Sequence, residues 1–285
     1  MADETTMTTA TELIRTEVIN LVILDALYAT MAVAPLIRNE ECPGDTNTMQ
    51  FPVWNDVNAS VATPGEATDL ANTALNPTAQ TITPTEKGIM TTVTDMLVKS
   101  SPASLEGIGR ELGRALGVKI DVDICALFAA LNGASAVGTT NTDLTVSVLL
   151  DAIYQLELDD VPAPFHCVLH PLQKEHLMID LTSSGSSPIW GGDLGNKIVS
   201  RGALDGMFGI DRFVTSTNVP TANTAADRCG ALFNPEAMAI VWKWRTKSET
   251  ERNASLRATE VVVTACYGVG EISDARGVPI ISDVD

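Results

Sequence analysis

Apolar side chains recur at helical spacing in two of the shorter segments of the chain. Thr11 to Ala34 places leucine, isoleucine, valine and methionine near a 3.6-residue repeat. The following segment, Asn39 to Asp45, contains a Pro-Gly pair and predicts a turn that ends the helix. Asp143 to Leu158 repeats the helical spacing, with its valine, leucine and isoleucine residues on one side. We predict a helix in each of the two periodic segments.

The longest helical pattern covers residues 101–132. Its apolar positions are Leu105, Ile108, Leu112, Leu116, Ile124, Leu127, Phe128 and Leu131. Ser101 and Pro102 suit the cap and first turn of a helix, and Gly133 suits its end. At 1.5 Å per residue, roughly 30 residues give a rod of ~45 Å. A rod of this length is typical of a helix that braces a flat or extended subunit.

Threonine and valine replace the helical pattern between residues 46 and 99. Twelve threonines fall from Thr46 to Thr94. Met49 to Val57 and Thr81 to Lys99 are typical of strands, and the stretch between them is polar and turn-prone. We therefore predict a long hairpin with a large irregular tip. Since an isolated hairpin is only marginally stable in water, this segment must gain its order by lying on another surface.

The C-terminal part of the chain contains four further stretches that are typical of strands. They are Gly209 to Pro220, Ala237 to Trp244, Thr259 to Val269 and the final sequence GVPIIS. Between two of them, Lys243 to Arg257 mixes both signs of charge. We interpret this segment as a solvated link, and ion pairing between subunits is the alternative.

The net charge limits the partners that the chain can bind. It has 18 basic and 36 acidic residues, which gives a net charge of −18. Proteins that bind nucleic acids neutralise phosphates with lysine and arginine, so tight general binding of DNA is excluded. Charged residues make up only 19% of the chain, which indicates that much of the surface lies against a membrane or against partner subunits.

The most apolar run favours partner subunits over a membrane. Val18 to Ile37 is long enough to span a bilayer, but it contains Asn20, Asp25 and Pro35 and lacks flanking basic residues. We therefore reject a transmembrane helix and predict a helix buried against protein. The N-terminal sequence MADETTMTTATE is acidic and polar, so we expect no secretory signal.

The five cysteines are scattered singly along the chain. They are Cys42, Cys125, Cys167, Cys229 and Cys266. An odd number without a CxxC pair indicates neither a disulfide framework nor a zinc site. The distribution fits a reducing cytosol.

All three histidines lie in one stretch of twelve residues, FHCVLHPLQKEH, from Phe165 to His176. Pro171 prevents a single helix across it. On a strand, His166 and His170 would share a face but lie about 13 Å apart, too far for one zinc ion. Cys167 would point to the opposite side, which also excludes a Cys–His dyad. We interpret the stretch as a strand, a turn at the proline and a helix.

The sequence GIGRELGRALG resembles a dinucleotide-binding loop only in part. Leu112 stands where the third glycine is needed, and the run continues as a helix. Gly109, Gly113 and Gly117 recur every four residues on one helical face. Because glycine has no side chain, this face allows another backbone to approach closely. We predict a packing role and no nucleotide.

No catalytic, cofactor-binding or metal-ligating residue is predicted. Ser184 and Ser186 lie in the sequence SSGSS, which lacks the GxSxG elbow and an assignable base, so a surface loop is expected. An enzyme would need converging ionisable groups, and the sequence patterns indicate none.

The order of these segments resembles the major capsid proteins of tailed double-stranded-DNA bacteriophages, which have the Hong Kong 97-type fold. The hairpin that ends in TTVTDMLVKSS is similar to the family's extended loop, and SLEGIGRELGRALGVKIDVDICALFAAL is similar to its spine helix. CVLHPLQKEHL resembles its strand, proline and short helix, and MFGIDRFVTSTNVP resembles its glycine, strand and turn. NPEAMAIVWKW and YGVGEISDARGVPIIS resemble its closing strands. The resemblance covers nearly the whole chain.

The resemblance implies an α+β fold in five parts. They are an N-terminal arm (1–45), an extended hairpin loop (46–99), a peripheral domain with the spine helix (100–138), an axial domain (139–235) and the closing strands of the peripheral domain (236–285). It also implies a structural subunit, not an enzyme, that forms the hexamers and pentamers of an icosahedral phage head. This head would be assembled in the host cytoplasm and would enclose DNA without binding it tightly. Portal, scaffolding and decoration proteins are the expected further partners, with no membrane and no cofactor.

Some shells of this family carry a lysine-to-asparagine isopeptide cross-link from a lysine in the extended loop. Here no lysine occurs from Met1 through Glu86, and Lys87 lies on the returning strand, so we predict no such cross-link. The short arm implies a separate scaffolding protein, or none. The alternative function is an encapsulin, a bacterial compartment shell of the same fold, and the second alternative is a soluble enzyme.

Overall fold

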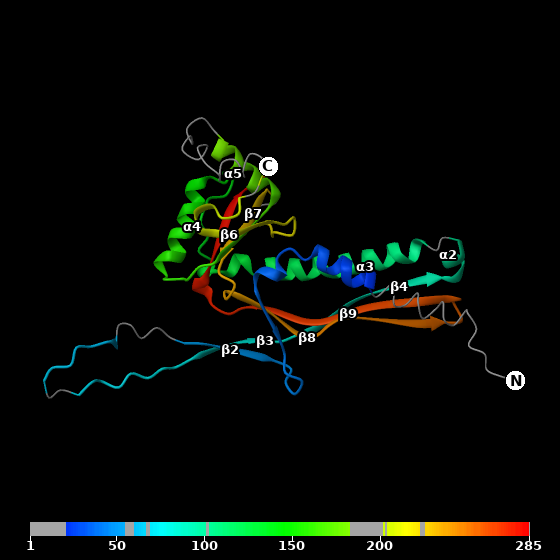
Figure 1. Ribbon diagram of the computed structural model, residues 1–285, viewed down its shortest axis with the longest axis horizontal. Helices are drawn as coiled ribbons and strands as arrows, with labels where there is room; N and C mark the ends of the chain where they lie inside the picture. Colours follow the sequence, from blue (N-terminus) through cyan, green and yellow to red (C-terminus); the bar gives the residue numbers. More distant parts are fainter. Residues whose placement is uncertain are drawn as a thin grey trace.

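The computed structural model describes residues 21–54, 60–66, 69–100, 103–182, 202, 204–222 and 226–284. The subunit is an elongated α+β molecule in which helix α3 (Ala103–Cys125) lies along a sheet of long strands (Figure 1). A more compact lobe containing α4 (Val146–Leu158) and α5 (Pro171–Thr182) stands at one end of this helix, and a thin hairpin projects beyond the lobe (Figure 1).

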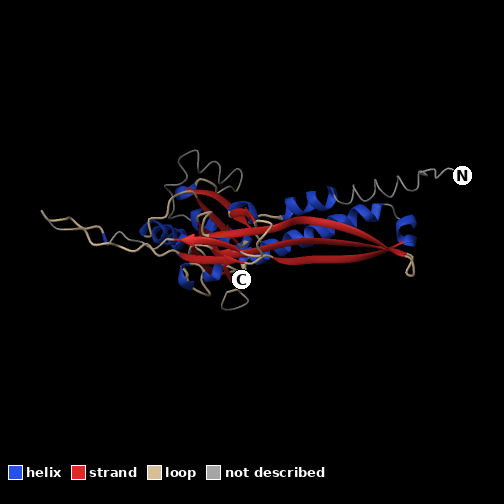
Figure 2. Ribbon diagram, turned by 90° about the horizontal axis from the view of Figure 1, so that it is seen from below, coloured by secondary structure: helices blue, strands red, loops and turns tan. Residues whose placement is uncertain are grey.

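The first sheet lies alongside α3 for most of the length of that helix (Figure 2). Its strands, in order, are β1 (Arg38–Glu41), β8 (Met238–Asn253), β9 (Ala258–Glu271) and β4 (Thr85–Thr94). β1 is parallel to β8, and the other neighbours are antiparallel. Ile240 and Val263 of the sheet belong to the same buried cluster as Leu116, Ile120 and Ile124 of α3. The helical repeat of α3 therefore matches the face that it buries.

The second sheet forms the core of the compact lobe. Its strands, in order, are β10 (Gly277–Asp283), β7 (Asp227–Phe233), β5 (Phe165–Leu169) and β6 (Ile210–Thr215). Helices α4 (Val146–Leu158) and α5 (Pro171–Thr182) pack on it through leucines such as Leu149, Leu156 and Leu177. The predicted helix at Asp143 to Leu158 is confirmed and begins three residues later than expected.

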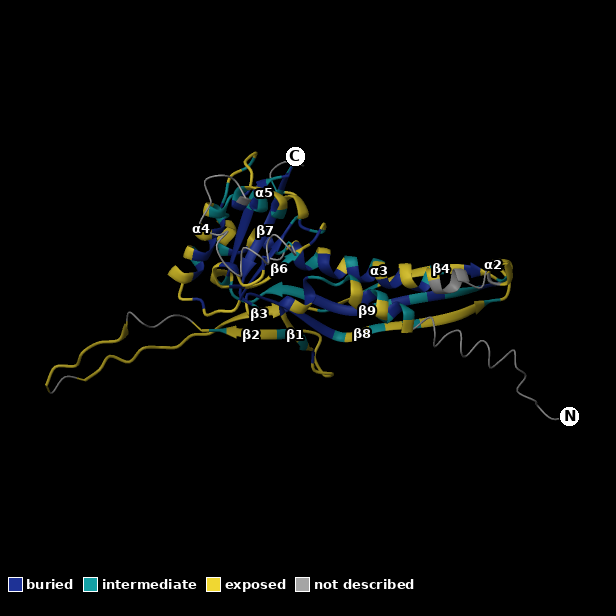
Figure 3. Cartoon of the chain, turned by 45° about the horizontal axis from the view of Figure 1, so that its top comes forward, coloured by how far each residue is buried: buried dark blue, intermediate teal, exposed yellow. Residues whose placement is uncertain are grey.

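The hairpin is a two-stranded ribbon of β2 (Met49–Val53) and β3 (Thr78–Ile82). At its base, Phe51 and Ile82 pack on Ala239 and Val241 of β8. The connection between the two strands extends away from the body, and its described residues are exposed (Figure 3). Among the described residues of the hairpin, the contacts with the body lie at its base, where Phe51 and Ile82 meet the first sheet.

Helix α3 is shorter than the helix predicted over residues 101–132. It ends at Cys125, and two 3₁₀ turns follow. Phe128 and Leu131 are fully buried from these turns, so the apolar spacing continues where the α-helix does not. At 1.5 Å per residue, the rod measures about 35 Å instead of ~45 Å.

The predicted second strand of the hairpin, Thr81 to Lys99, is three separate elements. β3 ends at Ile82, β4 begins at Thr85, and the short helix α2 covers Asp95–Ser100. Pro84 stands between the two strands, where its missing N–H cannot interrupt a hydrogen-bond ladder. The returning chain thus leaves the hairpin and pairs with β9 in the first sheet.

The expected solvated link at Lys243 to Arg257 is wrong. β8 continues to Asn253, a turn follows, and β9 begins at Ala258. The two strands form a long ribbon whose polar residues are largely exposed. The sequence does not predict a strand here because polar residues do not alternate with apolar ones. Likewise, Asn39 to Asp45 is only partly a turn, because its first residues belong to β1.

The strand predicted at GVPIIS exists as β10, but it lies in the second sheet beside β7 and not with the other closing strands. In the arm, residues 21–30 are helical, which confirms part of the helix predicted at Thr11 to Ala34, but the α-helix ends at Thr30 and Ala34 belongs to a 3₁₀ turn, Ala34–Leu36. In the described part of the chain, no helix combines the length and apolar character needed to cross a bilayer. The boundaries of the five parts remain a prediction.

Candidate assembly surfaces

The glycines of α3 form a groove that holds the arm helix, residues 21–30. A side-chain carbon added at Gly113 would lie 2.3 Å from the carbonyl oxygen of Ile23, and one added at Gly117 would lie 3.0 Å from that of Leu27. Ile23 and Leu27 are themselves buried. The predicted packing role is therefore confirmed for Gly113 and Gly117 and stays a prediction for Gly109, and the backbone that approaches the two glycines is the arm of the same subunit.

Asp121 fastens the end of the arm. Its Oδ2 atom accepts a hydrogen bond from the backbone N–H of Ala32 at 2.7 Å, and Oδ1 accepts from Val33 at 3.2 Å and Ala34 at 3.4 Å. Burial raises the pKa of Asp121, and the three hydrogen bonds oppose that rise. The sequence analysis missed this residue. The signal was an acidic residue that directly follows Ile120 and precedes Ile124 on the apolar side of a long helix.

A second carboxylate on α3 ties the helix to two strands of the first sheet. Asp123 accepts hydrogen bonds from Lys87 of β4 at 2.5 Å, from Lys119 at 2.7 Å and from the hydroxyl of Tyr267 of β9 at 2.8 Å. Burial alone would raise the pKa of Asp123, but these donors outweigh it and lower the pKa. Lys87 is thus engaged within its own subunit, and the prediction that it forms no cross-link remains untested.

Charged residues of the β8–β9 ribbon pair within the subunit. Arg252 forms two hydrogen bonds to Asp95, at 2.5 and 2.7 Å, and Arg245 pairs with Glu41 at 3.2 Å. Lys247 pairs with Glu249. Exposed ion pairs of this kind contribute little to the free energy of folding. Their main effect is that each pair neutralises its own charge on the surface.

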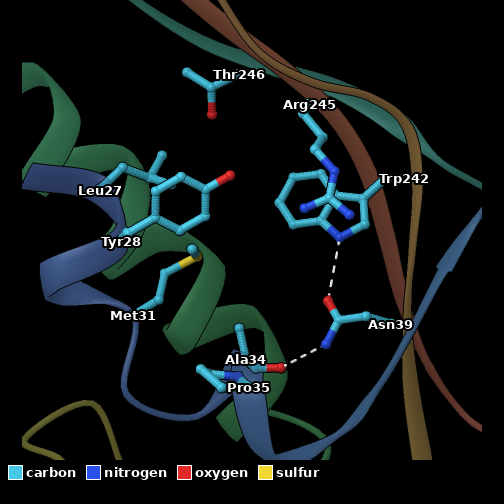
Figure 4. A pocket seen from close by; sticks show the side chains of 9 residues that line it. All are labelled: Leu27, Tyr28, Met31, Ala34, Pro35, Asn39, Trp242, Arg245 and Thr246. Atoms are coloured by element: carbon cyan, nitrogen blue, oxygen red, sulfur yellow. Dashed lines mark hydrogen bonds between the residues drawn. The ribbon is translucent and has the colours of Figure 1, made fainter. Parts of the chain in front are cut away.

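An apolar cleft lies between the arm and β8 (Figure 4). We call it the arm cleft, and it encloses about 270 Å³. Its lining residues are Leu27, Tyr28, Met31, Ala34, Pro35, Asn39, Trp242, Arg245 and Thr246. The guanidinium of Arg245 stands 5.7 Å from the centre of the Trp242 ring, and the indole N–H of Trp242 donates to Asn39 at 3.4 Å. The cleft therefore has apolar walls and one cation at its rim.

The hairpin exposes large apolar side chains far from this cleft. They are Trp54, Val61, Leu70 and Leu75, each more than half exposed. Water-exposed apolar groups of this size on a protruding ribbon are typical of an interface that forms on assembly. Helix α4 adds Leu150, Tyr154 and Leu158 on its outer face.

The histidine stretch has the local structure that the sequence predicts. β5 holds His166 and Cys167, which are both buried, and α5 begins at Pro171 and carries His176. The His166 ring meets Phe233 edge-on, with ring centres 6.4 Å apart. Burial lowers the pKa of His166 and raises that of the Cys167 thiol. Among the residues that the structure describes, no three His, Cys, Asp or Glu side chains are placed to share a metal. Ser184 and Ser186 lie outside the described residues.

The comparisons with known proteins identify the class to which this architecture belongs. A family model of phage capsid proteins matches residues 77–280, more than two thirds of the chain. The chain therefore belongs to the phage capsid protein family. It is a structural subunit of a phage head shell and a component of the virion. No curated protein matches the sequence.

Solved structures share the fold at low sequence identity. A chain from Mycobacterium phage Che8 is 20% identical, with a TM-score of 0.66 over 83% of this chain and 85% of that one. The head of Helicobacter pylori bacteriophage KHP40 gives 13% identity and a TM-score of 0.68, over 87% and 88%. A virus-like particle from Pyrococcus furiosus gives 9% and 0.60, over 94% and 98%. These likenesses confirm the predicted Hong Kong 97-type fold.

Proposed function

We propose that the subunit assembles into hexamers and pentamers, and that these close into an icosahedral head that encloses double-stranded DNA. The hairpin carries this proposal. Its described residues beyond β2 and β3 are exposed and display large apolar side chains, a combination that gains stability only when a neighbouring copy covers it. Many such weak contacts, repeated around a closed shell, give a stable particle.

The charge of the chain supports enclosure of DNA without tight binding. A net charge of −18 repels phosphates, so packed DNA would not adhere to the wall. Assembly would take place in the host cytoplasm, with a portal protein and with scaffolding or decoration proteins as further partners. The buried cysteine thiols are consistent with a reducing compartment.

Two alternatives remain distinguishable. An encapsulin shares the fold but holds protein cargo, and the family match to phage capsid proteins favours the head shell. An enzyme would need a cleft with converging ionisable groups. The arm cleft offers one arginine among mainly apolar walls, which does not suit catalysis.

The test is assembly of the purified chain, followed by electron microscopy and analytical centrifugation. We expect closed particles from the unaltered protein. A variant in which a two-residue Asn-Gly turn replaces residues 54–77, between the paired residues Val53 and Thr78, keeps β2 and β3 and should remain soluble without forming shells. Circular dichroism provides the control for folding. Normal shells from the shortened variant would refute the role of the hairpin, and protein cargo in place of nucleic acid in natural particles would favour the compartment.

A further inference from the structure

Trp54 is the largest apolar side chain that the hairpin leaves in water. It directly follows β2 and is 61% exposed. Burial of an aromatic side chain removes a large apolar area from water, and tryptophan is enriched among the residues that dominate interface energies. An exposed tryptophan on a projecting ribbon is therefore expected to bind in a pocket of another molecule.

The arm cleft has the size and chemistry of such a site. At about 270 Å³ it is smaller than typical small-molecule pockets, which measure roughly 300–1,000 Å³, and suits a single large side chain. Leu27, Met31 and Trp242 supply apolar and aromatic walls, and Figure 4 shows Tyr28 and Arg245 on opposite sides of the opening. A cation at the rim of an aromatic site favours the face of an incoming indole.

The cleft and the hairpin of one subunit lie on opposite faces of the first sheet. The base of the hairpin packs on Ala239 and Val241 of β8. The alternate residues Ile240 and Trp242 belong to the cluster on the other face, which includes the arm. Because successive strand residues point to opposite sides, the sheet separates Trp54 from the cleft of its own chain. The occupant must come from a second copy.

The distribution of charge is compatible with the same pairing. The hairpin from Met49 to Ile82 contains three acidic residues and no basic one. The stretch of β8 beside the cleft, from Lys243 to Arg252, contains four basic residues and two acidic ones. Glu41 and Asp95 pair with Arg245 and Arg252, so this surface is close to neutral in a chain with a net charge of −18. An acidic ribbon would be repelled less by it than by most of the remaining surface.

From these observations we infer that the arm cleft of each subunit receives Trp54 from the hairpin of a neighbouring copy. This inference rests on the proposed function, and it adds the receiving site. The insertion covers the exposed indole, fills the cleft and packs the hairpin against the arm helix. It also makes hairpin docking dependent on a correctly seated arm, because Leu27 and Met31 form part of the cleft.

Disulfide trapping tests the contact directly. The five native cysteines are buried and free, so introduced cysteines should dominate oxidation. Shells of the double variant Trp54→Cys, Thr246→Cys should become covalently linked oligomers on mild oxidation, visible on a non-reducing gel. The matched control, Trp54→Cys with Tyr154→Cys, places the second thiol on α4, at a side chain that is also 61% exposed, and should remain monomeric. Shells without linkage of the first pair, or equal linkage of both pairs, would overturn the inference.

A second measurement does not depend on cysteine chemistry. Trp54→Ala should raise the protein concentration needed for assembly by about tenfold or more, whereas Trp54→Phe, which keeps an aromatic ring, should raise it by about threefold or less. Equal thresholds for the alanine, phenylalanine and unaltered chains would contradict the insertion while leaving the head-shell function intact. Failure of the unaltered chain to form any shell would instead refute the proposed function and the inference together.

Discussion

Replacing Gly113 with alanine should displace the arm helix from α3. The added carbon would lie 2.3 Å from the carbonyl oxygen of Ile23, closer than any stable contact, and the atom that it meets is backbone. A backbone segment cannot rotate away as a flexible side chain can. Either the two helices separate locally or the arm leaves its groove.

The magnitude follows from two opposing effects. Alanine is favoured over glycine inside a helix by about 1 kcal/mol, which stabilises α3 itself. Against this, overpacking typically costs about 1–3 kcal/mol. Complete release would expose Ile23 and Leu27, each worth about 1.5–3 kcal/mol of burial. We therefore expect a net loss of about 0–2 kcal/mol if the helices only separate locally and about 2–5 kcal/mol if the arm is released, together with an arm that is more accessible.

Gly107 provides the matched control on the same helix. A carbon added there meets nothing within 4 Å, so Gly107→Ala should be neutral or stabilise the chain by up to about 1 kcal/mol. The assays are urea unfolding and limited chymotrypsin digestion at Tyr28, an exposed residue of the arm helix. Gly117→Ala, with its closest approach of 3.0 Å, should fall between the two. If Gly113→Ala matched the Gly107→Ala control in stability and in digestion rate, the arm would not occupy the groove.

Two further predictions concern carboxylates with a raised pKa, Asp121 and Glu271. Asp121→Ala removes the acceptor for three backbone N–H groups of the arm and should cost about 2–4 kcal/mol in urea unfolding, whereas Asp121→Asn, which keeps one oxygen acceptor, should cost about half as much; equal stability of the three chains would refute the fastening role. Burial and the neighbouring Asp274 raise the pKa of Glu271, so the folded state binds its proton more tightly than the unfolded state. The resulting stabilisation is fully present below the ordinary pKa of glutamate and is lost as the pH rises through the raised pKa of the folded state. Glu271→Gln should therefore stabilise the chain relative to the unaltered protein at pH 8 but not at pH 4.5. If the melting temperatures of the two chains differed by the same amount at every pH in this range, the raised pKa of Glu271 would be contradicted.

The sequence by itself determined much of the local structure. The repeat of apolar residues in α3 and α4, the proline at the start of α5 and the short apolar run of β5 each depend on interactions between near neighbours in the chain. The glycine spacing on α3 also predicted close packing, because the absence of a side chain has the same consequence whichever backbone approaches.

Only the tertiary structure decided which segments meet. The sequence patterns predicted a single strand from Thr81 to Lys99 and a solvated link from Lys243 to Arg257. In the structure, β4 instead pairs with β9, and β8 continues through the charged segment. Hydrogen bonds between strands join residues far apart in the sequence. A polar strand also lacks the alternation of apolar residues from which a strand is predicted. The arm cleft has the same origin, since Leu27 and Trp242 come together only when the arm lies on α3 beside β8.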